Sequence, residues 1–431
     1  MKFLYSSIIS FIYTSIVFFI DFCLPIFSWK IFGYQLYNSK QQDFYFGRKK
    51  NIEIINNNQF QVFRSLESSV IWFHCSSLGE FEQSRPLIEK IKKLLPEYKI
   101  VLTFFSPSGY NVMKDFPLAD WTGYLPLDVP KQMDSLVKFI NPKILILSKN
   151  EFWPNMLYCL KQYKIPVIAI SSRFKIYDIF WNSWAAWFFE ALKTIDHFYI
   201  ANNHSKEILN QNGIFDTTVV GDTRMDRVLN ILNEKKELKI LDDFLKNKEC
   251  WIAGSTWDED YSLFMNYIHK DKSSKVIIAP HDCNSQSVLL ITKKLNVPYA
   301  LWSNYSYEND HLKKILIIDT IGVLKNAYRY AKWAYIGGGM GRWGLHNILE
   351  AAVYDLPIII GKNYMKFPEA IDLIKKGGCF SVSSRSEFEK VVKNIYNELN
   401  FTKIINSNYI KEQQGATEKI FIGLKKILVE V

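Results

Sequence analysis

The stretch WAYIGGGMGRWGLHNILEAAVYDLPIIIG at residues 333–361 decides the fold class of this chain. An apolar run passes into a glycine-rich loop, a helical pattern follows from about His346, and a second apolar run closes the stretch. Apolar strands separated by a helix are typical of a parallel sheet covered on both faces. Glycines let the backbone approach a phosphate closely, and a helix N-terminus offers free N–H groups. The stretch therefore predicts a strand–loop–helix–strand unit with a nucleotide-phosphate site.

The same alternation extends outward over most of the chain. Two series of apolar strand candidates are separated by a polar passage rich in Lys and Glu at about 221–249. The first series lies at 70–75, 99–105, 144–148, 166–171 and 197–200, and the second at 251–254, 275–279, 315–319, 333–337 and 357–361. We therefore expect an α/β fold with two Rossmann-like doubly wound domains, 31–215 and 216–431. They would face a central cleft, because open α/β sheets bind ligands beyond the carboxyl ends of their strands.

The N-terminus carries 18 residues without a charge at positions 3–20, FLYSSIISFIYTSIVFFI, near the lower length for a membrane-spanning helix. No small-residue cleavage site follows, which favours an uncleaved anchor at 1–30 over a signal peptide. The alternative is a buried helix of the first domain. Basic residues are concentrated after the run, so the positive-inside tendency predicts catalytic domains on the cytoplasmic side.

A second aromatic stretch, YDIFWNSWAAWFF at 177–189, suits the headgroup layer of a membrane. An amphipathic helix packed on its own domain explains it equally well. The formal charge of +10 fits nucleic acid, an anionic bilayer or a phosphorylated substrate, or a general bias of composition towards Lys, Asn and Ile. The aromatic stretches favour lipid over nucleic acid. The six cysteines form no CxxC pair, and none lies near histidines at metal-ligand spacing, which predicts a reducing compartment and no structural zinc.

Several polar residues directly follow predicted strands. Glu80, after the strand at 70–75, is placed as a general base, or merely favours the positive end of a helix. Ser255 and Thr256 suit a phosphate, or serve as helix caps. The other candidates at strand ends are Lys149, Glu151 and His281.

The glycines at 339, 341 and 344 spell G-x-G-x-x-G, the dinucleotide fingerprint. That fingerprint requires an acidic residue at the end of the next strand, where this chain has Ile360-Gly361-Lys362. A nicotinamide or flavin enzyme is therefore disfavoured. The chain also lacks Walker A, H-E-x-x-H, G-x-S-x-G and metal-binding Asp-x-Asp motifs, which fits a metal-independent two-lobed transferase.

Seven sequence blocks occur in an order that resembles one known family. They are HCSSLGE (74–80), KNEFWPN (149–155), GDTRMD (221–226), AGST (253–256), IIAPH (277–281), DTIG (319–322) and GGGMGRWGLHNILEAA (337–352). This order resembles that of the 3-deoxy-D-manno-octulosonic acid (Kdo) transferases, from the N-terminal anchor to about Glu369.

The resemblance implies the GT-B glycosyltransferase fold, with CMP-Kdo as donor and neither cofactor nor metal. The acceptor would be the primary hydroxyl of a tetraacylated lipid A precursor, lipid IVA, in lipopolysaccharide core biosynthesis at the inner (cytoplasmic) membrane, with no nucleic-acid partner. Glu80 matches the catalytic base of an inverting transfer, and Arg224 stands where the family usually has lysine. The predicted donor-binding residues are Ser255, Thr256, Arg224, Gly338, Gly339, His346, Asn347, Glu350 and His281.

The chain departs from the family pattern at three places. Lys149 replaces a usual glutamate, Pro280 is followed by His281 and Asp282 instead of Arg-His-Pro, and Leu345 replaces a glycine. These changes concern single donor or acceptor contacts and leave the class of enzyme unchanged. An enzyme of the same fold that uses a UDP-sugar, either a transferase or an epimerase, is the alternative. A non-enzymatic membrane adaptor would have no use for the glycine loop and Glu80 together.

Overall fold

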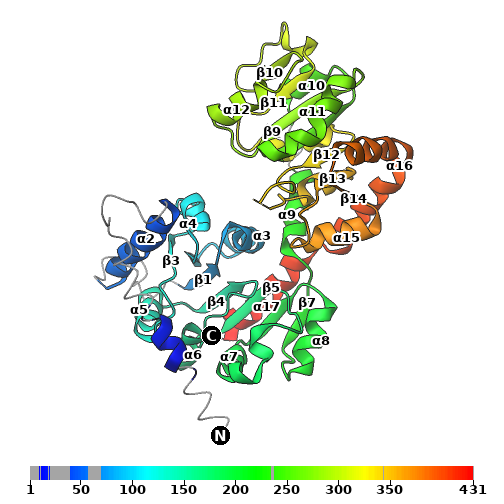
Figure 1. The fold of residues 1–431 in the computed structure, drawn as a ribbon. Coiled ribbons are helices and arrows are strands. Elements are labelled where there is room, and N and C mark those ends of the chain that lie inside the picture. Colours follow the sequence, from blue (N-terminus) through cyan, green and yellow to red (C-terminus); the bar gives the residue numbers. More distant parts are fainter. Residues whose placement is uncertain are drawn as a thin grey trace. The chain divides into compact units, whose positions relative to one another are not determined.

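The computed structural model describes residues 9, 11–17, 19, 39–56, 69–233, 237–342 and 344–430. The chain divides into two compact units, Met1–Asp226 with Gln414–Val431, and Arg227–Gln413. Each unit is built on one seven-stranded sheet, and all the paired strands are parallel (Figure 1). The expected fold class of two doubly wound α/β domains is confirmed.

The first unit has the strand order β3-β2-β1-β4-β5-β6-β7. Its strands are β1 Val70–Cys75, β2 Lys99–Phe104, β3 Trp121–Tyr124, β4 Ile144–Ser148, β5 Val167–Ser172, β6 His197–Ile200 and β7 Thr217–Val219. Its helices are α2 Ser39–Asn56, α3 Leu78–Leu94, α4 Pro107–Met113, α5 Pro130–Ile140, α6 Pro154–Gln162, α7 Ala186–Leu192, α8 Asn203–Gln211 and α17 Ala416–Glu430. The strand order reverses between β1 and β4, which marks the topological switch point of this sheet.

Helices cover both faces of the first sheet. Because successive strand side chains point to opposite faces, Trp72 of β1 joins the core beneath α5 and α6, while Phe73 joins the core beneath α3 and α17. Burial on both faces explains why the central strands are continuous apolar runs in the sequence.

The second unit has the strand order β10-β11-β9-β8-β12-β13-β14. Its strands are β8 Cys250–Thr256, β9 Lys275–Pro280, β10 Tyr299–Leu301, β11 Ile315–Ile317, β12 Ala334–Ile336, β13 Ile358–Gly361 and β14 Cys379–Val382. Its helices are α10 Lys239–Leu245, α11 Tyr261–Lys270, α12 Ser285–Thr292, α13 Leu324–Ala327, α14 Leu349–Ala352, α15 Pro368–Lys376 and α16 Arg385–Glu412, and α9 Thr223–Asn233 enters it from the first unit. The switch point here lies between β8 and β12.

All ten expected strands are present, and the structure adds four that the sequence patterns did not predict. The added strands β3, β7, β10 and β14 are the outer strands of the two sheets. Each has only three or four residues and includes partly exposed positions. An edge strand is not covered on all sides, so it needs no continuous apolar run.

The unit bounds differ from the expected domains 31–215 and 216–431. The chain leaves the first unit after Asp226, within α9, and returns to it at Gln414. The returning helix α17, red in Figure 1, places Ile420 and Leu424 in the core that also holds residues of β1, β4 and β5. Asp226 fixes the start of this helix, because its carboxylate accepts the N–H groups of Gly415 and Thr417, both at 2.6 Å.

Only residues 9, 11–17 and 19 of the predicted anchor at 1–30 are described, and they are helical; the rest of that prediction lies outside the described residues. The Tyr13 hydroxyl donates to the Asp128 carboxylate at 3.1 Å, and its ring lies 4.8 Å from that of Trp187. Within the described ranges, no helix combines the length and the apolar character needed to cross a membrane.

The aromatic stretch at 177–189 forms two 3₁₀ turns, Ile179–Trp181 and Ser183–Ala185, and the start of α7. Phe180 and Trp187 are buried in the first unit, so part of the stretch packs on its own domain. Tyr177 is 79% exposed and Trp184 is 48% exposed. The stretch therefore has one packed side and one side that presents aromatic rings at the surface.

Candidate functional site

The switch point of the first sheet brings Glu80 and Lys149 together. β1 and β4 are neighbours in register, with Phe73 opposite Ile146, so the residues that follow them emerge at the same edge. Glu80 lies in the first turn of α3, and its side chain is 15% exposed. The Lys149 ammonium is 3.2 Å from one carboxylate oxygen, and the Ser77 hydroxyl donates to the other. This is the position where open α/β sheets bind ligands.

The position of Glu80 is fixed through its backbone as well. The hydroxyl of Ser148, the last residue of β4, donates to the backbone oxygen of Glu80 at 2.8 Å. Lys149 has a left-handed conformation with φ of 57°, which is uncommon for a residue with a side chain. Backbone strain of this kind occurs often at functional sites.

Opposing effects act on the Glu80 carboxyl. Burial would raise its pKa, but the charge of Lys149 and the hydrogen bond from Ser77 together lower the pKa below its usual value. Glu80 is therefore ionised at neutral pH. It can accept a proton, and the lysine favours its charged form.

Glu151, two residues after Lys149, has the opposite behaviour. Burial, with a smaller contribution from the negative charge of Glu80, raises the pKa of Glu151 to about 7. Two carboxyl groups with pKa values displaced in opposite directions are an arrangement that supports acid–base chemistry. Sequence reasoning placed Glu151 at this strand end, but could not assign it a protonation state, because that depends on burial.

In the second unit, the residues at the carboxyl ends of β8, β9 and β12 form another cluster. Ser255 has φ of 51°, again left-handed, at the end of β8. Thr256 is 2% exposed, and its hydroxyl lies 2.8 Å from the Tyr261 hydroxyl. Thr256 thus has protein partners of its own, whereas Ser255 is partly exposed at the mouth of the switch point.

Asp260 holds the glycine loop in place. This fully buried carboxylate accepts the Tyr335 hydroxyl at 2.6 Å, the N–H of Gly338 at 3.0 Å and the N–H of Trp257 at 2.8 Å. Because the N–H of Gly338 is already donated to Asp260, it is engaged within the protein. In the sequence, Asp260 is the last of three consecutive acidic residues, and nothing in the pattern shows which loop it reaches.

The glycines of this loop are required by the protein's own backbone. Gly338 has φ of 90°, and a Cβ there would lie 2.1 Å from the backbone oxygen of Gly344. A Cβ on Gly339 would lie 2.8 Å from the backbone N of Gly361 on β13.

The helix expected from about His346 is shorter than predicted, since α14 covers only Leu349–Ala352. A four-residue helix supplies little dipole.

Three aromatic rings gather beside the loop. His281, after β9, lies 4.7 Å from Trp257 and 4.3 Å from His346 between ring centroids. The indole Nε1–H of Trp257 donates to Nε2 of His346 at 2.8 Å. The structure therefore brings His281 and His346 together as neighbours, and adds Trp257, which the sequence patterns did not single out.

Two further predicted donor-binding residues, Asn347 and Glu350, lie close to each other. The Asn347 amide donates to the Glu350 carboxylate at 3.3 Å. Burial raises the pKa of Glu350, while Arg227 and the Asn347 hydrogen bond act in the other direction. This pair belongs to the same strand-end region as the glycine loop.

Arg224 belongs to the first unit, unlike the other predicted donor-binding residues. Its guanidinium Nη2 is 2.8 Å from the carboxylate of Asp222, which is 1% exposed. Burial would raise the pKa of Asp222, but Arg224 and Arg173 together lower it to about 2. No group of three His, Cys, Asp or Glu side chains suited to a metal ion occurs among the residues with described positions.

Comparison with known proteins shows what this chain resembles. The model of the 3-deoxy-D-manno-octulosonic-acid transferase (kdotransferase) N-terminal domain matches residues 45–227. The Kdo transferase of Haemophilus influenzae is 25% identical over 83% of this chain and 87% of its own length. That of Aquifex aeolicus is 26% identical over 74% of this chain and 83% of its own length. A bifunctional glycosyltransferase/methyltransferase of Fusobacterium nucleatum is 27% identical over 84% of this chain, which spans only 58% of that protein.

Solved structures give the fold. The Staphylococcus aureus MnaA–UDP structure superposes with a TM-score of 0.58 at 12% identity, over 84% of this chain and 98% of that one. The UDP-GlcNAc 2-epimerase of Neisseria meningitidis, bound to UDP-GlcNAc, has a TM-score of 0.58 at 15% identity, over 83% of this chain and all of that one. At these identities the likeness concerns architecture, which is GT-B. Taken with the matched domain and the relatives that align over most of the sequence, the chain is a glycosyltransferase, and the proteins that it resembles are Kdo transferases.

Proposed function

We propose that this enzyme transfers Kdo from CMP-Kdo to a lipid A precursor, with inversion and without a metal ion. One observation carries the proposal: Glu80 is held as a carboxylate at the switch point of the domain that the family model matches. The proposal that the transferred sugar is Kdo comes from the names of the Haemophilus and Aquifex relatives. The donor nucleotide and the lipid acceptor rest on the sequence blocks that resemble the family.

In the proposed reaction, the acceptor's primary hydroxyl loses its proton to Glu80 as its oxygen attacks the anomeric carbon of Kdo. The bond from that carbon to the phosphate oxygen breaks, and CMP leaves with the electron pair. The proton remains on the Glu80 carboxyl until solvent removes it. A general base of this kind contributes roughly 10²–10⁴ to the rate.

The second unit supplies the proposed nucleotide site. The left-handed Ser255, the loop held by Asp260, and His346 lie at the carboxyl ends of neighbouring strands β8 and β12. Sugar-nucleotide phosphates suit such an edge because backbone and side-chain N–H groups converge there. Arg224 lies in the first unit, where Asp222 orients its guanidinium, and its proposed role toward phosphate rests on the sequence blocks alone.

We further propose that the enzyme works at the inner membrane, with its catalytic units on the cytoplasmic side. Support comes from the uncharged run at 3–20 and from the exposed apolar side chains among its described residues. Phe11 is 74% exposed and Phe19 is 64% exposed, and Tyr13 between them contacts Trp187 of the aromatic stretch. An acyl-chain acceptor explains such a surface better than a water-soluble acceptor does.

The transfer assay combines the full-length protein, CMP-Kdo and a tetraacyl disaccharide 1,4′-bisphosphate, with products read by mass spectrometry. Wild type is expected to give product, and Glu80→Gln to lose about 10²-fold or more in kcat with CMP binding retained. Glu97→Gln, an exposed glutamate just beyond α3, is the matched control and should keep full activity. If folded wild type fails with CMP-Kdo but transfers from a UDP-sugar, the donor assignment is wrong.

The membrane proposal has a separate test, co-sedimentation of the full chain with vesicles that contain anionic phospholipid. Tyr177→Ser with Trp184→Ser should reduce the bound fraction, since each exposed ring contributes apolar area at headgroup depth. Tyr307→Ser, at a ring of the second unit that is 54% exposed, is the control. If the double variant binds vesicles as well as wild type does, the aromatic stretch does not contact the membrane.

A further inference from the structure

The contact between Trp257 and His346 determines which nitrogen of the histidine carries its proton. An indole N–H only donates a hydrogen bond, so Nε2 of His346, 2.8 Å away, must accept it. In a neutral imidazole with Nε2 as acceptor, the proton lies on Nδ1. The side chain therefore presents one defined N–H donor.

The ring geometry shows that this is an edge-to-edge contact. The planes of Trp257 and His346 differ by 13°, yet their centroids are 6.3 Å apart. Rings stacked face to face lie closer than this, as His281 does to both partners at 4.7 and 4.3 Å. Trp257 and His346 thus form a nearly coplanar pair, and His281 covers one face of it.

The surroundings hold His346 in this orientation. A Cβ on Gly338 would lie 3.1 Å from Cδ2 of His346, so the loop packs against that edge of the ring. The indole occupies the adjacent Nε2 edge, and the Trp257 backbone is itself fixed by Asp260. Burial, with a smaller effect of His281, lowers the pKa of His346 to about 4, so the ring is neutral at physiological pH and Nε2 remains an acceptor. The edge that carries Nδ1 is the one left to meet a ligand at the end of β12.

We propose that Trp257 is a positioning residue that fixes His346 as its Nδ1–H tautomer, so that His346 donates a hydrogen bond to a phosphate oxygen of the nucleotide donor. The ligand part rests on the proposed function, whereas the tautomer is a property of the protein alone. A locked tautomer raises the fraction of molecules ready to bind, because a freely exchanging imidazole presents the required N–H only part of the time.

The test uses the full-length protein labelled with ¹⁵N-histidine and a long-range ¹H–¹⁵N correlation spectrum at pH 7.5, with the His346 signals identified by their loss in His346→Gln. Wild type is expected to show a protonated Nδ1 and a bare Nε2. Trp257→Phe keeps an aromatic ring but removes the N–H. It should populate the Nε2–H form and weaken CMP binding by about threefold to tenfold in calorimetry. Trp302→Phe, a half-buried tryptophan of the same unit, should change neither measurement.

An Nε2–H signal for His346 in wild type would overturn the proposal without any variant being needed. An unchanged His346 spectrum in Trp257→Phe would overturn the role of the indole. If the tautomer responds as expected but wild type does not bind CMP, the donor assignment fails and the positioning role of Trp257 stands. If CMP binds equally to wild type and Trp257→Phe while the tautomer shifts, His346 does not donate to the nucleotide.

Discussion

Replacing Lys149 with methionine should make the enzyme more sensitive to acid. The ammonium lies 3.2 Å from the Glu80 carboxylate, and loss of its charge raises the pKa of Glu80. At that separation, Coulomb's law gives about 1.3 kcal/mol in water and about 5 kcal/mol at an effective dielectric of 20. The Lys149 side chain is 42% exposed, which favours the low end of this range. Because exposed ion pairs are weakened by solvent, we expect Lys149 to favour the ionised form of Glu80 by about 1 kcal/mol.

A free-energy change of about 1 kcal/mol is about fivefold in an equilibrium constant. The assay is kcat/KM for Kdo transfer from pH 4.5 to 8.5. Relative to wild type, Lys149→Met should lose activity at the acid end of this range and keep it at pH 8.5, where Glu80 is ionised in both proteins; the loss tends to about fivefold only below the pKa of Glu80 in both. Lys149→Glu, which restores the residue usual in the family, should extend the acid loss because it adds a like charge.

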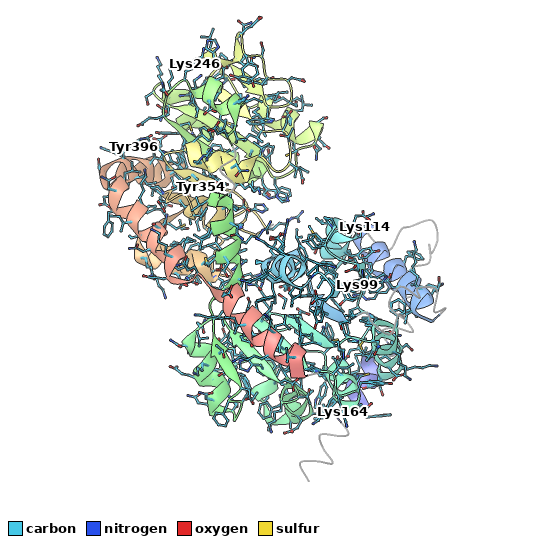
Figure 2. The ribbon with its side chains drawn as sticks, turned by 180° about the vertical axis from the view of Figure 1, so that it is seen from behind. Lys99, Lys114, Lys164, Lys246, Tyr354 and Tyr396 are labelled. Atoms are coloured by element: carbon cyan, nitrogen blue, oxygen red, sulfur yellow. The ribbon has the colours of Figure 1, made fainter. Side chains whose placement is uncertain are left out.

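Two controls isolate this effect. Lys164→Met is the matched variant. Lys164, labelled in Figure 2, is exposed and has the same left-handed backbone conformation, with φ of 55° compared with 57° for Lys149. Repeating the series in a Glu151→Gln background removes the neighbouring carboxyl that titrates at about 7. An acid limb that does not move in Lys149→Met in either background would refute the electrostatic role of Lys149.

Three further predictions concern stability. Asp222→Asn should lower the free energy of unfolding by about 2–3 kcal/mol at pH 7 in urea titrations. Because the folded pKa of Asp222 is depressed to about 2, the wild-type advantage should vanish as pH falls from 4 to 2. Glu151→Gln should become more stable relative to wild type as pH rises from 5 to 8. The raised folded pKa of Glu151 stabilises wild type at low pH, and this contribution is lost as the pH rises through about 7. Asp226→Ala should cost about 1–2 kcal/mol and selectively lower hydrogen-exchange protection in α17; equal protection would contradict its capping role.

The central strands could be predicted because burial on both faces leaves a direct trace in the sequence. ILILS at 144–148 became β4 without a change of bounds. The edge strand WTGY at 121–124 could not be found this way, since its first two residues are only half-buried and it contains glycine. The short α14 also departs from its pattern, because the loop held by Asp260 continues into the segment that looked helical.

The candidate site was predictable in position and less so in its chemistry. Glu80 and Ser255 follow strands, and the strand-end rule is enough to find them. The ion pair of Glu80 with Lys149 requires the register of β1 and β4, and the contact of Trp257 with His346 joins residues 89 positions apart. Such contacts depend on tertiary placement, so no local pattern of residues encodes them.

The return of α17 to the first unit has a consequence for biogenesis. The second unit, Arg227–Gln413, is in effect an insertion of 187 residues between two parts of the first unit. At about 5–20 residues per second, a ribosome takes roughly ten to forty seconds to traverse that insertion. Throughout this time, the core of the first unit lacks Ile420 and Leu424. The nascent enzyme therefore finishes its second unit before its first, whose core is incomplete until translation reaches α17.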